Sequence, residues 1–520
     1  MDLNYHLITT LPCYILLSLG LMGLFRKAGE EGWKAFVPVL NMVVWLKIIG
    51  RPKWWIIWFL IPVINMIMGV SILIDLLRSF GKEKYWEHIL GVLVPFLFLP
   101  YVAFNKNDRY EGAWVEVGRP KATRKSEIRE WADAILFAGS AAMIIRTFLM
   151  EAFMIPTTSM EGSLLAGDFL FVSKFHYGVR LPMVPFAIPF IHNTIPGTNT
   201  RSYLEWPSLP YSRLFGIREV DRNDIVVFNY PFNDAVPDNN QDFTVEIPSM
   251  KQNYIKRCVA IGGDTLTVSN GVVFINGKES WKPEYLQFNY WVFADPPGLN
   301  TKFLQQMGFR TGRNDNNHNF YDTECKEGSR MVYSASLNDE QLAKIKALKQ
   351  VVRIEPQLQL SSQPNTHKFY DGEHNNCPYA VPSPLFPGYG NNGKGGNSRD
   401  MNGWNLDNFG PLYIPERGKT ITLSRANIFN YSRVIEEYEK HKLQIEGNRI
   451  LIDGVETTEY TFEMNYYFMM GDNRHSSLDS RYWGFVPEDH VVGRPWFVLF
   501  SYEEGIRWNR VMAPISNWEE

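Results

Sequence analysis

The sequence FMIPTTSM at residues 153–160 follows an apolar segment and is the first of three short stretches that decide how the second part of the chain folds. The second is YIKR at residues 254–257, and the third is the polar loop GDNR at residues 471–474. Serine is a poor nucleophile at neutral pH unless a neighbouring base removes its proton. Because no histidine lies in a comparable setting, the pattern predicts a serine that uses a lysine as its base, in a protease tethered beside a membrane.

Composition excludes some classes of protein. The 520 residues are enough for two or three domains, and they divide into an apolar first third and a polar remainder. The formal net charge of -3 argues against a nucleic-acid-binding protein, which usually carries a basic face. Cysteine usage is low, with Cys13 and Cys258 in apolar runs and Cys325 and Cys377 in a polar region placed outside the cytoplasm. No CxxC pair exists, so no structural zinc site is expected, while a disulfide between Cys325 and Cys377 stays open.

The first third predicts several membrane segments. Residues 7–25 are nearly free of charge and long enough to cross a bilayer, and residues 54–77, 88–104 and 132–150 are further candidates. Residues 36–50 are shorter and are interpreted as re-entrant or interfacial. The segment 105–131 carries seven basic residues close to helix ends, which predicts that it faces the cytoplasm and that Ser159 lies on the opposite side.

The remainder predicts a mainly antiparallel β domain. Short apolar runs at 168–172, 224–228, 272–275, 449–452 and 466–470 are separated by turn residues, and Asn276-Gly277 is a strong hairpin turn. Residues 280–446 interrupt this pattern and are interpreted as an insertion, hereafter the insertion. Its one clear helix is predicted over 338–349, where Asn338 and Gln341 form a capping box.

Three sequence boxes carry a family resemblance. Residues 153–160 with GDFLFV at 167–172 resemble the nucleophile region of bacterial signal peptidase I. YIKR at 254–257 with GGD at 262–264 resembles its lysine box, and GDNRHSSLDSRYWG at 471–484 resembles its third box. The boxes occur in the family's order. Two residues depart from it, since Gly162 stands where proline is usual and His475 where aspartate is common.

The resemblance implies specific roles. Ser159 would be the nucleophile and Lys256 the general base, whose ordinary pKa of about 10.4 must be lowered by burial. The Thr157 hydroxyl and the Ser159 backbone N–H would stabilise the oxyanion. In the third box, Ser477 would contact the lysine amine, and Asp479 with Arg481 would form a bracing ion pair. The positions that match the walls of the substrate pockets are Phe153, Ile155, Leu164, Leu170, Tyr254 and Ile255.

The predicted fold is therefore a multi-helix transmembrane N-terminal region followed by a mainly antiparallel β catalytic domain of signal-peptidase type with a large insertion. The predicted boundaries are a membrane region at 1–104, a basic linker at 105–131, a transmembrane helix at 132–152, the catalytic domain at 153–279 and 447–520, and the insertion at 280–446.

The predicted function is removal of signal peptides from exported preproteins. The protein would lie in the cytoplasmic membrane with its catalytic domain on the outer face, in contact with the lipid bilayer and near the secretion translocon. No metal or organic cofactor and no nucleic acid are implied. Late aromatic residues such as Trp483, Phe485, Trp496, Phe497 and Trp508 would seat the domain at the bilayer or pack in its core. Two alternatives are a self-cleaving serine–lysine protease and a catalytically silent membrane scaffold that binds exported chains.

Overall fold

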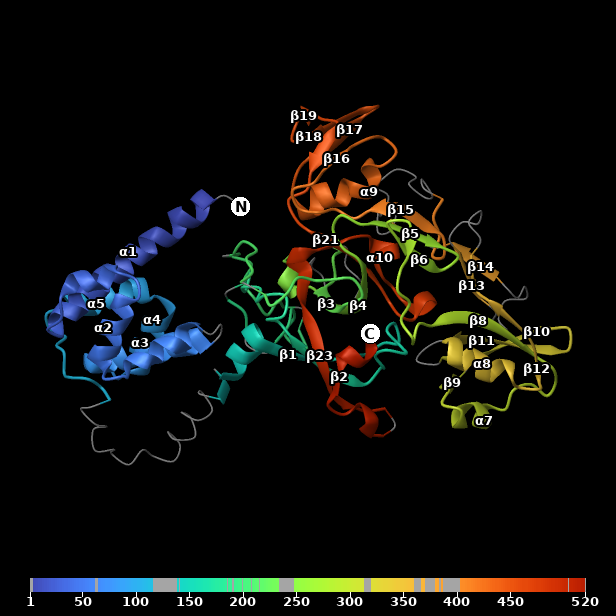
Figure 1. The fold of residues 1–520 in the computed structure, drawn as a ribbon, viewed down its shortest axis with the longest axis horizontal. Coiled ribbons are helices and arrows are strands. Elements are labelled where there is room, and N and C mark those ends of the chain that lie inside the picture. The colour runs from blue at the N-terminus through green and yellow to red at the C-terminus, as the bar shows by residue number, and fades with distance from the viewer. Residues whose placement is uncertain are drawn as a thin grey trace. The chain divides into compact units, whose positions relative to one another are not determined.

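The computed structural model describes residues 3–60, 64–115, 138–139, 141–184, 186–188, 191–198, 200–206, 208–214, 216–232, 247–312, 319–359, 366–369, 379–382, 385–386, 403–503 and 505–519. The chain forms two compact units, Met1–Ser140 and Ala141–Glu520 (Figure 1).

The first unit is helical. Glycines on α1 let α5 approach closely, because a Cβ on Gly20 would lie 2.7 Å from Pro100 and one on Gly23 would lie 2.8 Å from Ala103. Lys27, the last residue of α1, donates to three carbonyl oxygens in the last turn of α5 and just after it, at 2.7–2.9 Å. A cation at this position satisfies the carbonyls that a helix end leaves without a partner. The elements are α1 (Leu3–Lys27), η1 (Gly32–Phe36), α2 (Leu40–Ile49), η2 (Lys53–Leu60), α3 (Ile64–Ser79), α4 (Tyr85–Leu93) and α5 (Pro95–Phe104).

The prediction of a multi-helix transmembrane region is wrong. Among the helices of the described residues, none combines the length and the apolar character needed to cross a bilayer. The predicted span 88–104 is broken between α4 and α5, because Pro95 cannot continue the preceding helix. The span 54–77 begins as a 3-10 helix, and its α-helical part carries the buried Asp75, which pairs with Arg51 at 2.8 Å. Of the predicted helix 132–152, residues 132–137 and 140 lie outside the described residues. Its described part ends at the helical turn η3 (Ile145–Leu149), and the strand β1 (Met150–Met154) follows.

The second unit is built on an antiparallel sheet that brings distant parts of the chain together (Figure 1). Its longest strand, β23, lies between β2 and β3, so the last part of the chain separates two early strands. Ile155, Leu164, Leu170, Val227 and Val498 form one core on this sheet. The strand order is β1 (Met150–Met154), β2 (Asp168–Ser173), β23 (Val491–Ser501), β3 (Ile225–Asn229), β4 (Asn253–Ala260), β21 (Tyr466–Met470) and β22 (Val486–Pro487), with β24 (Ala513–Pro514) paired to β23.

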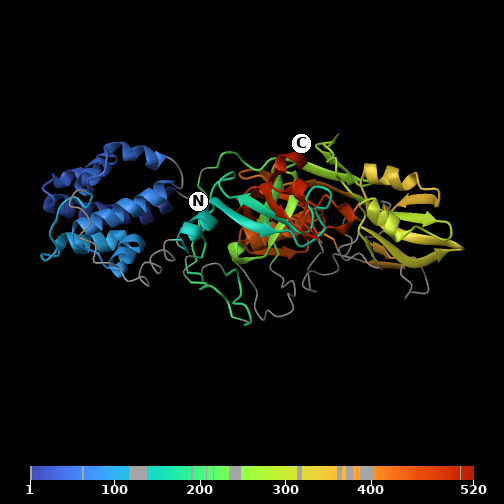
Figure 2. The same ribbon diagram turned by 90° about the horizontal axis from the view of Figure 1, so that it is seen from below.

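Part of the insertion forms a second sheet beside the first. Its strands, yellow in the figures, lie to one side of the red and teal strands of the main sheet in both views (Figures 1 and 2). The strand order is β12 (Val351–Pro356), β8 (Phe288–Ala294), β11 (Arg330–Leu337), β10 (Phe320–Glu327) and β9 (Thr311–Gly312), with α7 (Thr301–Gln306) and α8 (Asp339–Lys346).

The later part of the insertion packs differently. Phe409, Leu412 and Tyr431 share a core with Phe468 and Phe485, which follow the predicted insertion in the chain. This later part does not pack as a separate body, and the boundaries 280–446 of the insertion stay a prediction. The remaining strands are β5 (Thr265–Ser269), β6 (Val272–Ile275), β7 (Lys278–Glu279), β13 (Thr366–Phe369), β14 (Tyr379–Pro382), β15 (Phe409–Tyr413), β16 (Thr420–Thr422), β17 (Leu443–Glu446), β18 (Arg449–Ile452), β19 (Val455–Glu456) and β20 (Glu459–Thr461). The remaining helical turns are η3 (Ile145–Leu149), η4 (Pro248–Met250), α9 (Ile428–Arg433), η5 (Val434–Tyr438), η6 (Arg474–Ser476), α10 (Ser480–Trp483), η7 (Glu488–His490), η8 (Trp508–Arg510) and η9 (Ile515–Trp518).

Local predictions in this unit are accurate where turn chemistry is specific. The runs 272–275, 449–452 and 466–470 are the strands β6, β18 and β21. Asn276 and Gly277 both have positive φ, as a tight hairpin turn requires. The predicted capping box is present, since Asn338 and Gln341 exchange hydrogen bonds at the start of α8. Among the late aromatic residues, Trp483 and Phe485 are buried, whereas Trp496 and Trp508 are exposed.

Candidate active site

Ser159 lies in a tight turn that follows β1. The next residue, Met160, and Leu164 are both fully buried in the core of the main sheet and anchor the turn. Backbone bonds from Glu161 N–H to Thr158 O at 2.9 Å and from Leu164 N–H to Met160 O at 2.8 Å close it. The Thr157 hydroxyl lies 3.4 Å from Ser159 Oγ. Both hydroxyls are thus presented from the same short segment.

Lys256 lies within β4, opposite Val226 of β3. Its Nζ is 2.8 Å from Ser159 Oγ and donates to Ile255 O at 2.8 Å. Only 3% of the residue is exposed. Burial lowers the pKa of Lys256 to about 8, although the nearby carboxylates of Asp479 and Asp472 act in the opposite direction. A lysine with this pKa is partly neutral near pH 7–8 and lies within reach of the serine proton, as a general base must.

Arg257 points away from Lys256, as the alternation of side chains along a strand requires. It makes a fully buried ion pair with Asp472 at 2.7 Å and donates to the carbonyls of Asn223 and Trp518, each at 2.8 Å. Ser163 donates to the same carboxylate at 2.6 Å. Removing one partner of such a pair leaves an uncompensated buried charge, which makes the pair a strong link between β4 and the third box.

Asp479 and Arg481 form the predicted ion pair, 2.8 Å long and fully buried. Burial alone raises the pKa of the Asp479 carboxyl, but the Arg481 guanidinium outweighs it and holds the pKa below its usual range. Asp479 also accepts from Gly471 N–H at 3.1 Å. The carboxylate therefore fixes both ends of the loop 471–481 and faces Lys256 with a negative charge.

Ser477 differs from the prediction in its contacts. The amine of Lys256 donates to Ser159 and Ile255, whereas the buried Ser477 hydroxyl interacts with the Asp479 carboxylate and helps to hold the pKa of that carboxyl below its usual range. It lies against Gly471, where an added Cβ would come 2.2 Å from Ser477 Oγ and 2.5 Å from Ser159 O. The hydroxyl is thus close to the serine turn.

The residues predicted to line the substrate pockets lie in two neighbouring clusters. Ile155, Leu164 and Leu170 are buried in one cluster, with Phe153 and Ile255 packed at its edge. Tyr254 belongs to the next cluster and stacks on Tyr230 with ring centroids 4.8 Å apart. Because Tyr254 and Ile255 are consecutive in β4, they face opposite sides of the sheet.

Sequence reasoning missed a contact on the turn that carries Ser159. Glu161, 5% exposed, forms an ion pair with Arg310 of the insertion. Gly162 has φ +98°, and a Cβ there would lie 2.3 Å from the backbone oxygen of Tyr285. The sequence signal that could have revealed this contact is the glycine at position 162, where the family usually has proline, because only glycine tolerates both this φ and this close approach.

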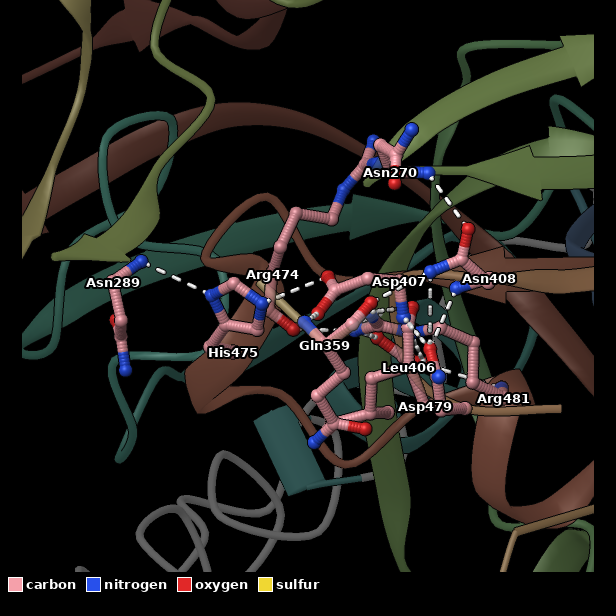
Figure 3. A network of polar contacts seen from close by, with 11 residues as sticks. Asn270, Asn289, Gln359, Leu406, Asp407, Asn408, Arg474, His475, Asp479 and Arg481 are labelled. Carbon is pink, nitrogen blue, oxygen red and sulfur yellow. Dashed lines mark hydrogen bonds and ion pairs between the residues drawn. The ribbon is translucent and has the colours of Figure 1, made fainter. Parts of the chain in front are cut away.

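His475 does not contact the dyad in the described structure. Its ring lies between Asn289 and Asp407 (Figure 3). Among the described residues, no group of three or more histidine, cysteine, aspartate or glutamate side chains is arranged to hold a metal ion.

Comparisons with known proteins identify two matching families. The model of the family described as signal peptidase, peptidase S26, matches residues 128–308 and 418–500, just over half of the chain. Residues 33–113 match a family of unknown function, DUF5684.

Individual relatives bear the name signal peptidase I. The one from Buchnera aphidicola subsp. Baizongia pistaciae is 24% identical over 378 residues, covering 71% of this chain and 77% of the relative. The one from Helicobacter pylori strain J99 is 23% identical, covering 71% of this chain and 80% of the relative. The one from Rickettsia rickettsii is 30% identical over 162 residues, covering 31% of this chain and 48% of the relative.

Proposed function

The chain belongs to the signal peptidase family, peptidase S26, whose members are serine endopeptidases, and from that membership we propose that Ser159 and Lys256 are the dyad with which it cleaves signal peptides from preproteins. The observation that carries the proposal is the 2.8 Å contact between Lys256 Nζ and Ser159 Oγ, made by a buried lysine with a lowered pKa.

The mechanism follows from this contact. Neutral Lys256 takes the proton of Ser159 as Oγ attacks the scissile carbonyl carbon, and the C=O electron pair moves to the oxygen. The oxyanion collapses, the C–N bond breaks, and the lysine ammonium gives its proton to the departing amine. Lys256, neutral again, then takes a proton from water as the water oxygen attacks the carbonyl carbon of the acyl-enzyme. The second oxyanion collapses, the C–Oγ bond breaks, Lys256 gives its proton to Ser159 Oγ, and the signal peptide leaves as a carboxylic acid. One base thus serves both halves of the reaction.

The oxyanion requires donors that are already in place. The Thr157 hydroxyl, 3.4 Å from Ser159 Oγ, and the Ser159 backbone N–H are the proposed donors. The proposed role of Ser477 is to hold the Lys256 amine when Ser159 Oγ is acylated. This proposal is supported by the position of Ser477, because a Cβ on Gly471 would meet both Ser477 Oγ and Ser159 O. Asp479 and Arg481 hold the segment that carries Ser477.

The substrate would bind as an added strand. Among the described strands, β1 pairs only with β2, and residues Asn253–Lys256 of β4 pair only with β3. Unpaired strand edges bind extended peptides through backbone hydrogen bonds, while side-chain pockets select residues. The apolar walls at Phe153, Ile155, Leu164, Leu170, Tyr254 and Ile255 would select small residues before the cleaved bond.

We also propose that the catalytic unit works at the outer face of the cytoplasmic membrane, close to the translocon and the lipid bilayer. Cys325 is disulfide-bonded, which favours an oxidising compartment, while Cys377 lies outside the described residues. Trp496 and Trp508 are 48% and 75% exposed, and tryptophan favours the membrane interface. A cysteine placed at the exposed Lys278 should react with an impermeant reagent in spheroplasts, and labelling only after lysis would contradict this location.

The decisive experiment is cleavage of a purified preprotein by wild-type protein and by Ser159→Ala and Lys256→Ala. Both variants should lose processing, whereas Lys278→Ala, which removes an exposed lysine of β7, should retain it. Normal cleavage by Ser159→Ala would exclude this serine as the nucleophile. A protein that binds preproteins but does not cut them in its wild-type form would be a scaffold.

A further inference from the structure

His475 connects the insertion to the catalytic loop by two hydrogen bonds. Its Nδ1 accepts from the backbone N–H of Asn289 at 3.1 Å, and its Nε2 lies 2.9 Å from Asp407 Oδ1 (Figure 3). Since Nδ1 accepts from an N–H group, the ring proton is assigned to Nε2, which donates to the carboxylate. The neutral imidazole thus uses both nitrogens to join the loop to two segments of the insertion.

Asp407 is held as firmly as the histidine. It is fully buried, and its second oxygen accepts from Gln359 N–H at 2.9 Å. Its own backbone N–H donates to Asn405 Oδ1 at 3.1 Å. A carboxylate fixed in this way gives His475 a rigid partner rather than a mobile one.

The contact continues to Lys256 through Arg481. The residue next to Asp407, Leu406, accepts from Arg481 Nη1 at 3.2 Å, and Arg481 Nη2 donates to the backbone oxygen of Arg474 (Figure 3). Arg481 pairs with Asp479, whose carboxylate faces Lys256. A shift of the Leu406-Asp407 segment would therefore move the ion pair that sets the surroundings of the base.

A second set of hydrogen bonds supports the same loop. Gln287 N–H donates to Asp472 O at 2.9 Å, and Arg474 N–H donates to Gln287 O at 3.0 Å. Asp407 lies between residues 308 and 418, outside the two stretches that match the family model. Aspartate at position 475 would place two carboxylates together in a buried site, which is unfavourable unless one of them is protonated. The histidine therefore matches a feature of this chain, Asp407.

We propose that His475 and Asp407 are positioning residues, through which the insertion holds the segment Ser477–Arg481 in register with Lys256. This inference rests on the proposed function of Ser159 and Lys256. It gives the insertion a role in the reaction without a contact to substrate. Loss of the pair should lower kcat and leave KM nearly unchanged, since the contacts described above use no backbone group of β1 or of residues 253–256 of β4, the edges proposed to bind the substrate.

The test is a charge swap followed by steady-state kinetics on a preprotein with the full chain. His475→Glu places two carboxylates together and should lower kcat at least about tenfold, with KM within about twofold, because misplacing catalytic groups by an ångström costs on the order of a hundredfold. Adding Asp407→Asn should restore kcat to within about threefold of wild type, since the amide donates to the new carboxylate and still accepts from Gln359 N–H. His441→Ala is the matched control, because His441 pairs with Asp453 at 2.6 Å in an exposed contact, where the chain enters β17 and leaves β18.

The outcomes separate this inference from the proposed function. Activity in Ser159→Ala would overturn the proposed function. If Ser159→Ala is inactive but His475→Glu keeps a kcat within twofold of wild type, only the positioning role is overturned. The positioning role is also overturned if His475→Glu loses kcat and the added Asp407→Asn does not restore it. If His475→Glu does not fold, His475→Gln decides, because glutamine can donate to Asp407 and accept from Asn289. A kcat within threefold of wild type then supports the pair, and a tenfold loss in folded protein contradicts it.

Discussion

The pH dependence of cleavage is the sharpest consequence of the buried lysine. With the pKa of Lys256 lowered to about 8, about one molecule in ten carries the neutral base at pH 7 and about nine in ten at pH 9. We therefore expect kcat/KM to rise about tenfold between these values and then to level off. A lysine with its ordinary pKa of about 10.4 would instead give a rise of nearly a hundredfold over the same range, with no plateau below pH 10.

The assay is cleavage of a preprotein-derived peptide from pH 6 to 10 at constant ionic strength, with each sample returned to pH 8 afterwards to show that no enzyme was lost. Asp479→Asn provides an internal check. The Asp479 carboxylate raises the pKa of Lys256, so its removal should move the midpoint to lower pH, whatever else it does to the rate. A flat profile, or a continuous rise to pH 10 in stable enzyme, would refute the lysine base as described.

Three further changes test other parts of the site. Lys256→Met should raise the free energy of unfolding by about 1–3 kcal/mol below pH 8, because the lowered pKa means that the charged lysine destabilises the folded state. This gain should vanish between pH 8 and 10.5, where the lysine loses its charge in the unfolded state as well. A gain that stays constant across this range in urea unfolding would contradict the assignment. Thr157→Val should lower kcat by roughly a hundredfold if its hydroxyl serves the oxyanion, and an unchanged kcat would leave that role to backbone donors. Gly162→Ala should lower the free energy of unfolding by more than about 2 kcal/mol, because the added Cβ meets the backbone oxygen of Tyr285 as well as an unfavourable φ. Gly454→Ala, at φ +82° with open space around it, should lose only the energy of the unfavourable φ. Equal losses of the two variants in thermal unfolding would show that Tyr285 shifts to make room for the methyl group.

The sequence by itself determined several local elements and predicted the residues of the proposed dyad. Specific turn residues fixed the hairpin at Asn276-Gly277 and the cap at Asn338, because these depend on neighbours along the chain. The three sequence boxes predicted Ser159, Lys256 and the pair of Asp479 with Arg481. Apolar content misled at the first unit, where the sequence predicted membrane spans and the helices are instead interrupted, as at Pro95.

Only the tertiary structure decided which distant residues meet. Nothing in the order of residues says that Arg310 pairs with Glu161, or that Asp407 pairs with His475, since these contacts join positions 149 and 68 residues apart. The pKa of Lys256 is also a tertiary property, because burial under other strands, and not the neighbouring residues in the chain, removes water from its amine. Sequence specifies which groups can react, and packing sets the distances and the solvent exclusion that make them do so.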